Sequence, residues 1–303
     1  MFSSWIFYVV IFIIAQVVFL QTFKYVAKNS KSIGALTVLV QIISAVSMLM
    51  LLPFFEWTLP SAADWWMWVL LGASFIFFAI NDRLDATTRK NLDVSVDAML
   101  HQTYRLLFLP LMVLLYWSAG QFAWSILVGS IVIVFMNMLL LYDKGKFRFN
   151  KYVVLKLISA AIFAFALSSQ LRATVRGATM SGFAIPFVVF LSFLVPALLL
   201  AGVKQATPFT VVKEFRRKEW WVLLICGVAQ GLMTFALYMA LDLAWKADNV
   251  NGMVYANAIM GVYVLLNAVF AFIFFKERKN LLIKIIAATV IVGCIVLIAF
   301  RPF

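Results

Sequence analysis

Three ionisable residues follow one another at four-residue steps inside an apolar stretch of the chain. The segment NLDVSVDAMLHQTYRLLFLPL, residues 91–111, contains Asp97, His101 and Arg105. Because a four-residue step in an α-helix rotates about 400°, these three side chains lie along one stripe of a helix. An ionised side chain at membrane depth costs at least about 2.5–3.5 kcal/mol. Three such groups on one stripe therefore point to a function.

The chemistry expected of this stripe is ligand binding. Arg105 lies at the midpoint of an apolar span over about 93–117, where its guanidinium, facing a water-filled cavity, can bind a carboxylate or phosphate bidentately. His101 titrates near neutral pH, and Asp97 can balance the Arg or exchange a proton. Neutral hydrogen-bonding residues flank the stripe, namely Gln102 and Tyr104. The alternative is an internal network that joins this span to a neighbouring helix without contacting a substrate.

Composition predicts the elements that carry the stripe. The chain is 65% hydrophobic and 12% charged, with a mean hydropathy of +1.04, whereas soluble domains are about 25% charged. Its apolar runs repeatedly reach the roughly 20 residues that a membrane-spanning helix requires. We therefore predict an all-α polytopic membrane protein with ten transmembrane helices. Their approximate limits are 4–23, 32–55, 64–81, 93–117, 122–142, 152–170, 179–202, 219–242, 251–275 and 281–300.

The net charge of +13 reflects membrane topology and gives no support to nucleic-acid binding. The loops after the odd-numbered spans carry 18 of the 25 Lys and Arg residues, and the opposite side carries 4. The positive-inside rule then places both termini outside, with anionic lipid head groups as possible contacts. Two cysteines and one histidine support neither a disulfide framework nor a metal site.

Two pairs of similar segments indicate an internal repeat. DWWMWVLLG at 64–72 is similar to EWWVLLICG at 219–227, and NLDV at 91–94 aligns with NVNG at 249–252 at an offset of 158 residues. At that offset spans 4 and 5 coincide with spans 9 and 10 without a gap. The chain is then two copies of one five-helix unit.

The repeat predicts the organisation of the whole chain. A first five-helix repeat covers 1–142, a basic connecting loop covers 143–151, and a second repeat covers 152–303. An odd number of spans per repeat forces the two copies into opposite orientations in the bilayer. Inverted repeats with a midplane binding site between them are typical of secondary transporters.

The second repeat supplies a candidate stacking wall. Adding 158 to the residue numbers of the charged stripe leads to Tyr255, Ile259 and Tyr263. Asn267 extends this second stripe by one turn. A polar wall opposite an aromatic wall suits an organic ion with an apolar portion. Further substrate-contact candidates lie four residues apart around Thr234 in span 8, namely Gln230 and Tyr238. Helix packing and interhelical hydrogen bonding are the competing interpretations of these residues.

The C-terminal stretch resembles a known family. Residues 250–298 are similar to the end of an EamA-type domain of the drug/metabolite transporter superfamily, in which a turn containing Glu precedes a last helix with small residues. Glu277, Ala287, Ala288 and Gly293 match those places. The resemblance implies a ten-helix, five-plus-five transporter.

Three features depart from the family pattern. Ala119 occupies the place of Glu277 in the first half. Span 1 has Gln16 near its midpoint and no Glu, whereas the small four-helix relatives carry an essential Glu there. Family members are expected to have cytoplasmic termini, which is opposite to the charge count.

We predict that the protein is not an enzyme, because the sequence contains no nucleophile–base pair, phosphate-binding glycine loop or metal-ligand cluster. It is expected to be a multi-pass cell-membrane protein and a secondary active transporter of a small polar or anionic organic metabolite. The substrate site is placed between helices 4 and 9, with no cofactor, possible coupling to an ion or proton, and a monomeric or homodimeric state. The alternative is a flippase or transporter of a lipid-linked intermediate.

Overall fold

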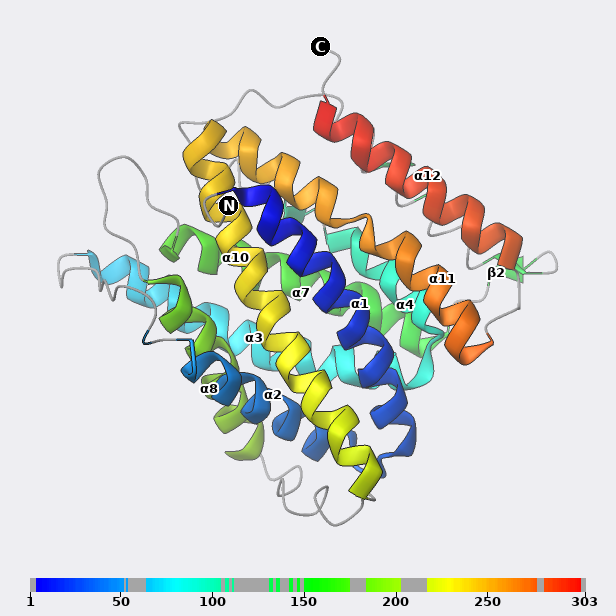
Figure 1. Cartoon of the computed structure of the whole chain (residues 1–303), viewed down its shortest axis with the longest axis horizontal. Coiled ribbons are helices and arrows are strands. Elements are labelled where there is room, and N and C mark those ends of the chain that lie inside the picture. Colours follow the sequence, from blue (N-terminus) through cyan, green and yellow to red (C-terminus); the bar gives the residue numbers. More distant parts are fainter. Residues whose placement is uncertain are drawn as a thin grey trace.

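The computed structural model describes residues 4–51, 53, 64–104, 107–108, 111, 131–132, 135–136, 142–143, 146–147, 150–174, 184–202, 217–276 and 281–300. This part of the chain is almost entirely helical (Figure 1). The helices are α1 (Trp5–Asn29), α2 (Ile33–Leu49), α3 (Trp65–Asn91), α4 (Val94–His101), the 3₁₀ turn η3 (Gln102–Tyr104), α7 (Lys151–Thr174), α8 (Ile185–Gly202), α10 (Arg217–Met260), α11 (Tyr263–Phe275) and α12 (Leu281–Phe300). A two-residue antiparallel strand pair, β1 (Tyr142–Asp143) and β2 (Lys146–Phe147), lies in the basic connecting region.

Among the residues that the structure describes, five helices are long and apolar enough to cross a membrane. They are α1, α3, α7, α8 and residues 219–247 of α10. Large apolar side chains lie on the outside of the bundle, with Ile14 59%, Trp221 69% and Leu282 71% exposed. Apolar outer faces on helices that satisfy their own backbone hydrogen bonds suit a lipid environment. The predicted all-α class of membrane protein agrees with this architecture.

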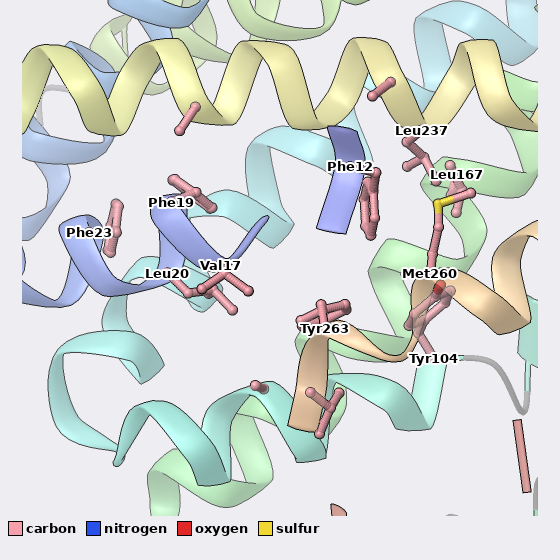
Figure 2. Close-up of a cluster of buried hydrophobic side chains, with 14 of the residues drawn as sticks. Phe12, Val17, Phe19, Leu20, Phe23, Tyr104, Leu167, Leu237, Met260 and Tyr263 are labelled. Carbon is pink, nitrogen blue, oxygen red and sulfur yellow. The ribbon is translucent and has the colours of Figure 1, made fainter. Parts of the chain in front are cut away.

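Helices from the two halves of the chain pack against each other throughout the bundle. In Figure 1 α1 runs beside α10, and the contacts also pair α3 with α7, α2 with α8, and α4 with α11. Figure 2 shows the core that results, with side chains from distant segments meeting, among them Phe12, Tyr104, Leu167 and Leu237. Since these four pairings each join the first half of the chain to the second, the centre of the molecule belongs to both halves.

Helix α10 reverses direction within its length, as Figure 1 shows near the N-terminus. A Cβ atom at Gly252 would overlap the carbonyl group of Ala244. Eight residues of a straight helix rise about 12 Å, so this proximity requires the chain to turn back. Gly252 is needed there because any side chain would collide with backbone. The two limbs of α10 correspond to the predicted eighth span and the start of the ninth.

Helix α3 extends ten residues beyond the predicted end of span 3 at residue 81, as far as Asn91. Its end is capped by Lys24 of α1, whose ammonium donates to the carbonyls of Arg89 at 2.9 Å, Lys90 at 3.1 Å and Leu92 at 2.5 Å. A cation at a helix C-terminus satisfies unpaired carbonyls and complements the helix dipole. The basic residues of 82–91, counted above as loop charges, are therefore helical.

Candidate functional site

A cavity of about 100 Å³ lies at the centre of the bundle. Its lining comes from both halves of the chain, from α1 to α4 and η3 and from α7, α8, α10 and α11. Many of the lining residues are polar: Gln16, Thr37, Gln41, Asn81, Asp82, Asp85, Arg89, His101, Tyr104, Ser192, Gln230, Thr234, Tyr238 and Tyr263. A polar cavity inside an apolar helical bundle is a candidate binding site.

The charged wall of the cavity belongs to α3. Phe78, Asp82, Asp85 and Arg89 line it at steps of four, three and four residues, which is the spacing of one helix face. These ionisable residues fall in the segment that hydropathy assigns to a loop, so the sequence-based site omitted them. Their helical spacing was the feature from which the face could have been found.

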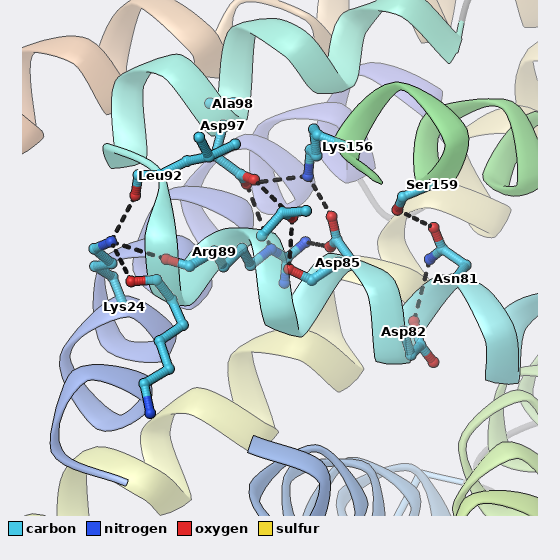
Figure 3. A network of polar contacts seen from close by, with 12 residues as sticks. Lys24, Asn81, Asp82, Asp85, Arg89, Leu92, Asp97, Ala98, Lys156 and Ser159 are labelled. Carbon is cyan, nitrogen blue, oxygen red and sulfur yellow. Dashed lines mark hydrogen bonds and ion pairs between the residues drawn. The ribbon is translucent and has the colours of Figure 1, made fainter. Parts of the chain in front are cut away.

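Four of the charged side chains form a buried ion cluster, drawn in Figure 3. Asp85 bonds both Arg89 and Lys156. Asp97 lies 3.1 Å from Lys156 and 3.7 Å from Arg89, and it accepts a hydrogen bond from the Thr88 hydroxyl at 3.2 Å. The Lys156 side chain is 0% exposed. Two carboxylates and two cations balance, as buried charges require.

The guanidinium of Arg89 is held on its other side by aromatic rings. Its central carbon lies 4.7 Å from the centroid of Phe19 and 5.4 Å from that of Phe23. Cation–π contacts of this kind add attraction when the cation is desolvated. Both rings also line the cavity, so the guanidinium and the two rings form one part of its wall.

Asp82 occupies a different environment on the same wall. Its carboxylate accepts hydrogen bonds from the side-chain amides of Gln41 and Asn81, the latter at 3.3 Å. Asn81 is oriented by the Ser159 hydroxyl, which donates to its amide oxygen at 2.8 Å. Within the described residues no ammonium or guanidinium group lies within 4.0 Å of Asp82. Figure 3 shows Asp82 linked to Asn81, outside the ion cluster.

The predicted stripe divides between two surroundings. Asp97, 2% exposed, belongs to the ion cluster and is not among the lining residues of the cavity. His101 lines the cavity, with its ring centroid 4.8 Å from that of Phe163 and 5.2 Å from that of Tyr104. Arg105 lies outside the described residues, so its role as an anion anchor stays a prediction.

The residues that flank the stripe join helices of the two halves. The side-chain amide of Gln102 donates to the Tyr263 hydroxyl at 2.7 Å, and the Tyr104 hydroxyl donates to Asn257 at 2.6 Å. Tyr104 and Tyr263 line the cavity, whereas Gln102 lies behind it. The expected proximity of spans 4 and 9 is therefore present, through direct side-chain hydrogen bonds.

The second stripe is not one continuous helix face. Helix α10 ends at Met260 and α11 begins at Tyr263, so a break separates Tyr255 from Tyr263. Tyr255 is half-buried away from the cavity lining, and Asn267 is buried, accepting a hydrogen bond from Gln21 at 3.0 Å. Of the predicted aromatic wall, Tyr263 lines the cavity.

Both candidates from span 8 line the cavity and also bond neighbouring helices. Gln230 accepts a hydrogen bond from the Ser44 hydroxyl at 3.2 Å. The Tyr238 hydroxyl donates to Gln170, whose amide donates to Ser192 at 2.6 Å. These bonds satisfy the tyrosine hydroxyl within the protein.

Comparisons with known proteins show a shared fold. No protein-family model matches the chain, and no curated protein matches it. A solved structure, described only as the crystal structure of a protein, is similar over 97% of this chain and 95% of that chain, with a TM-score of 0.64 and 15% sequence identity. Among the residues that carry the family resemblance, Ala287 and Ala288 are buried, Gly293 has open space around it, and Glu277 lies outside the described residues. Ala119, which departs from the family pattern, also lies outside them.

Proposed function

We propose that the protein is a multi-pass cell-membrane transporter that moves a small polar organic metabolite by alternating access. The observation that carries this proposal is the polar cavity whose walls come from both halves of the chain. A site shared by two halves can open to either side when the halves rock against each other. Membership of the drug/metabolite transporter superfamily, with ten spans in two inverted repeats, is part of the proposal.

The pattern of helix contacts supports an inverted repeat. If residues 1–142 and 152–303 are equivalent, α1 corresponds to α7, α2 to α8, α3 to the first limb of α10, and α4 to its second limb. A two-fold axis then exchanges the α1–α10 contact with the α3–α7 contact, and it maps the α2–α8 contact onto itself. All three contacts are present in the bundle. Such an axis lies in the membrane plane when the repeats are inverted.

Matching helix interruptions in the two halves give independent support. The 3₁₀ turn at 102–104 follows α4, and adding the repeat offset of 158 leads to 260–262, where α10 gives way to α11. The Gln102–Tyr263 hydrogen bond joins the two interruptions directly. Interrupted helices at corresponding positions of two repeats are a feature of transporter binding sites.

Uptake into vesicles tests the proposal. Purified protein is reconstituted into liposomes, incubated with a mixture of small polar metabolites, and the retained compounds are measured by mass spectrometry against protein-free vesicles. A matched pair on α10 links uptake to the cavity, because Met233 lines it and the neighbouring Leu232 is 36% exposed on the outside. Met233→Trp should abolish uptake by filling the cavity, whereas Leu232→Trp should retain it.

The outcomes separate the candidate functions. Retention of a soluble metabolite that depends on Met233 supports the transporter. Movement of polyprenyl-linked or phospholipid head groups alone would instead favour translocation of a lipid-linked intermediate. No ATP-binding motif is present in the sequence, so concentrative uptake should require an imposed ion or proton gradient or a counter-substrate.

The prediction of an anionic substrate group rests on Arg105. If Arg105 anchors such a group, Arg105→Lys should weaken substrate binding moderately because it loses the bidentate geometry, and Arg105→Gln should nearly abolish it. Both variants should keep the melting temperature of the wild type. A fall in melting temperature on Arg105→Gln that Asp97→Asn restores, with binding intact, would assign Arg105 to the scaffold.

A further inference from the structure

The described carboxyl groups around the cavity outnumber the cations paired with them. Asp82 and Asp85 line it, and Asp97 lies behind them, whereas the cations that accompany these groups are Arg89 and Lys156. Both cations are engaged by Asp85 and Asp97. Asp82 is therefore the carboxyl group at the cavity wall that the ion cluster leaves without a cation.

A second unsatisfied group lies beside that carboxylate. Gln41 is 1% exposed and lines the cavity, and its amide nitrogen donates to Asp82. The amide oxygen of the same side chain is buried and accepts no hydrogen bond from the described residues. A buried acceptor without a donor costs about 1–3 kcal/mol, so a group that supplies N–H or O–H at this corner stabilises it.

We infer that Asp82 and Gln41 form the binding site for the protonated amino group of an organic substrate. This inference rests on the proposed transport function and names its substrate class. An ammonium group has three donors and one positive charge, so it can satisfy the Asp82 carboxylate and the Gln41 amide oxygen together.

The rest of the cavity suits the body of such a molecule. Aromatic rings line it on several sides, including Phe78 on the Asp82 face of α3, Phe163 and Phe193. Aromatic faces attract cations and cover apolar groups. A carboxylate that has no cationic partner among the described residues repels an anionic ligand, which makes the corner selective as well as attractive.

A matched series of probes tests the charge preference in the unmodified protein. Binding of 2-phenylethylamine, 2-phenylethanol and 3-phenylpropionate to detergent-solubilised protein is measured by isothermal titration calorimetry at pH 7. The three probes share a phenyl ring and differ in charge. The ammonium probe should bind at least tenfold more tightly than the other two. Equal affinity for the three, or preference for the carboxylate, overturns the inference.

Three variants assign the preference to this corner. Asp82→Asn should lower affinity for 2-phenylethylamine at least tenfold and leave that for 2-phenylethanol unchanged, and Gln41→Met should lower it several-fold. Asp93→Asn is the control, because Asp93 is an exposed carboxylate outside the cavity, paired with Lys284 at 3.0 Å. Unchanged ammonium binding in a folded Asp82→Asn protein overturns the inference. The inference is also overturned if sodium chloride alone stabilises the protein through Asp82 and amines do not compete with the sodium ion.

Uptake measurements separate this inference from the proposed function. Asp82-dependent binding of 2-phenylethylamine without Met233-dependent uptake of any compound would contradict transport and leave the amine site in place. Uptake of compounds that lack an amino group, undiminished in Asp82→Asn, would contradict the amine site and leave transport in place.

Discussion

Two aspartates three residues apart on α3 have opposite surroundings. Asp85 is in contact with two cations, Arg89 and Lys156, and the charges of the cluster cancel. Asp82 has only amide donors, and the neighbouring amide oxygen of Gln41 accepts no hydrogen bond from the described residues. The first group is charge-balanced within the protein, whereas the second has neither a cation nor a donor to the Gln41 amide oxygen among the described residues.

The comparison teaches how to separate a scaffold from a site inside a membrane bundle. An intramembrane charge is expensive and therefore draws attention as a functional group. When its neighbours neutralise it fully, however, its removal is expected to affect folding first. Unsatisfied polar atoms at a cavity wall mark the place where a ligand completes the structure.

The largest effect is expected at Lys156. Lys156→Met keeps an unbranched side chain of similar size but removes the cation, which leaves two carboxylates with one guanidinium. Breaking a buried charge pair by removing one partner costs about 3–5 kcal/mol, so the free energy of unfolding should fall by about this amount. Denaturant unfolding in mixed micelles, followed by tryptophan fluorescence, measures it.

A double variant provides the control for Lys156. In the double variant Lys156→Met with Asp97→Asn, one carboxylate, Asp85, and one cation, Arg89, remain and balance. The free energies of unfolding of the two changes should therefore couple by about 1–3 kcal/mol. If the losses in free energy of unfolding of the two single variants simply add in the double variant, the charges of the cluster are not coupled.

A smaller effect should separate the two aspartates directly. Asp85→Asn and Asp82→Asn are the same isosteric change on the same helix face. Asp85→Asn loses its charged hydrogen bonds and should destabilise the protein by about 2–3 kcal/mol, whereas Asp82→Asn should alter stability by less than about 1 kcal/mol. Equal losses of stability would show that Asp82 is also part of the scaffold.

The smallest effect concerns one neutral hydroxyl in each region. Thr88→Val removes the donor to Asp97, and Ser159→Ala removes the donor that orients Asn81 beside Asp82. Each should cost about 0.5–1.5 kcal/mol of stability. Only Ser159→Ala should also weaken binding of 2-phenylethylamine, by a few-fold in calorimetric titration. Weakened binding in Thr88→Val instead would mean that the ion cluster participates in the site.

Sequence reasoning identified part of the cavity. His101, Tyr104, Tyr263, Gln230 and Tyr238 were selected because polar residues recurred at helical spacing in apolar spans, and the structure places all five in the lining. Their substrate contacts remain predictions. Asp82, Asp85 and Arg89 were missed because a window rich in charge reads as a loop when burial and pairing are not known. Helix α3 tolerates Asp85 and Arg89 because Lys156 of α7 and Asp97 of α4 pair with them.

The sequence by itself determined the class of protein and the positions of most helices. Apolar runs of membrane-spanning length leave a chain few options in lipid, because every backbone N–H and C=O must be bonded within the segment. Only the tertiary structure decided which carboxyl group, Asp85 or Asp82, has a cationic partner. Lys156 reaches Asp85 across 71 residues of sequence and Asp97 across 59, and Gln41 reaches Asp82 across 41. Periodicity describes one helix at a time, whereas charge compensation depends on which helices become neighbours.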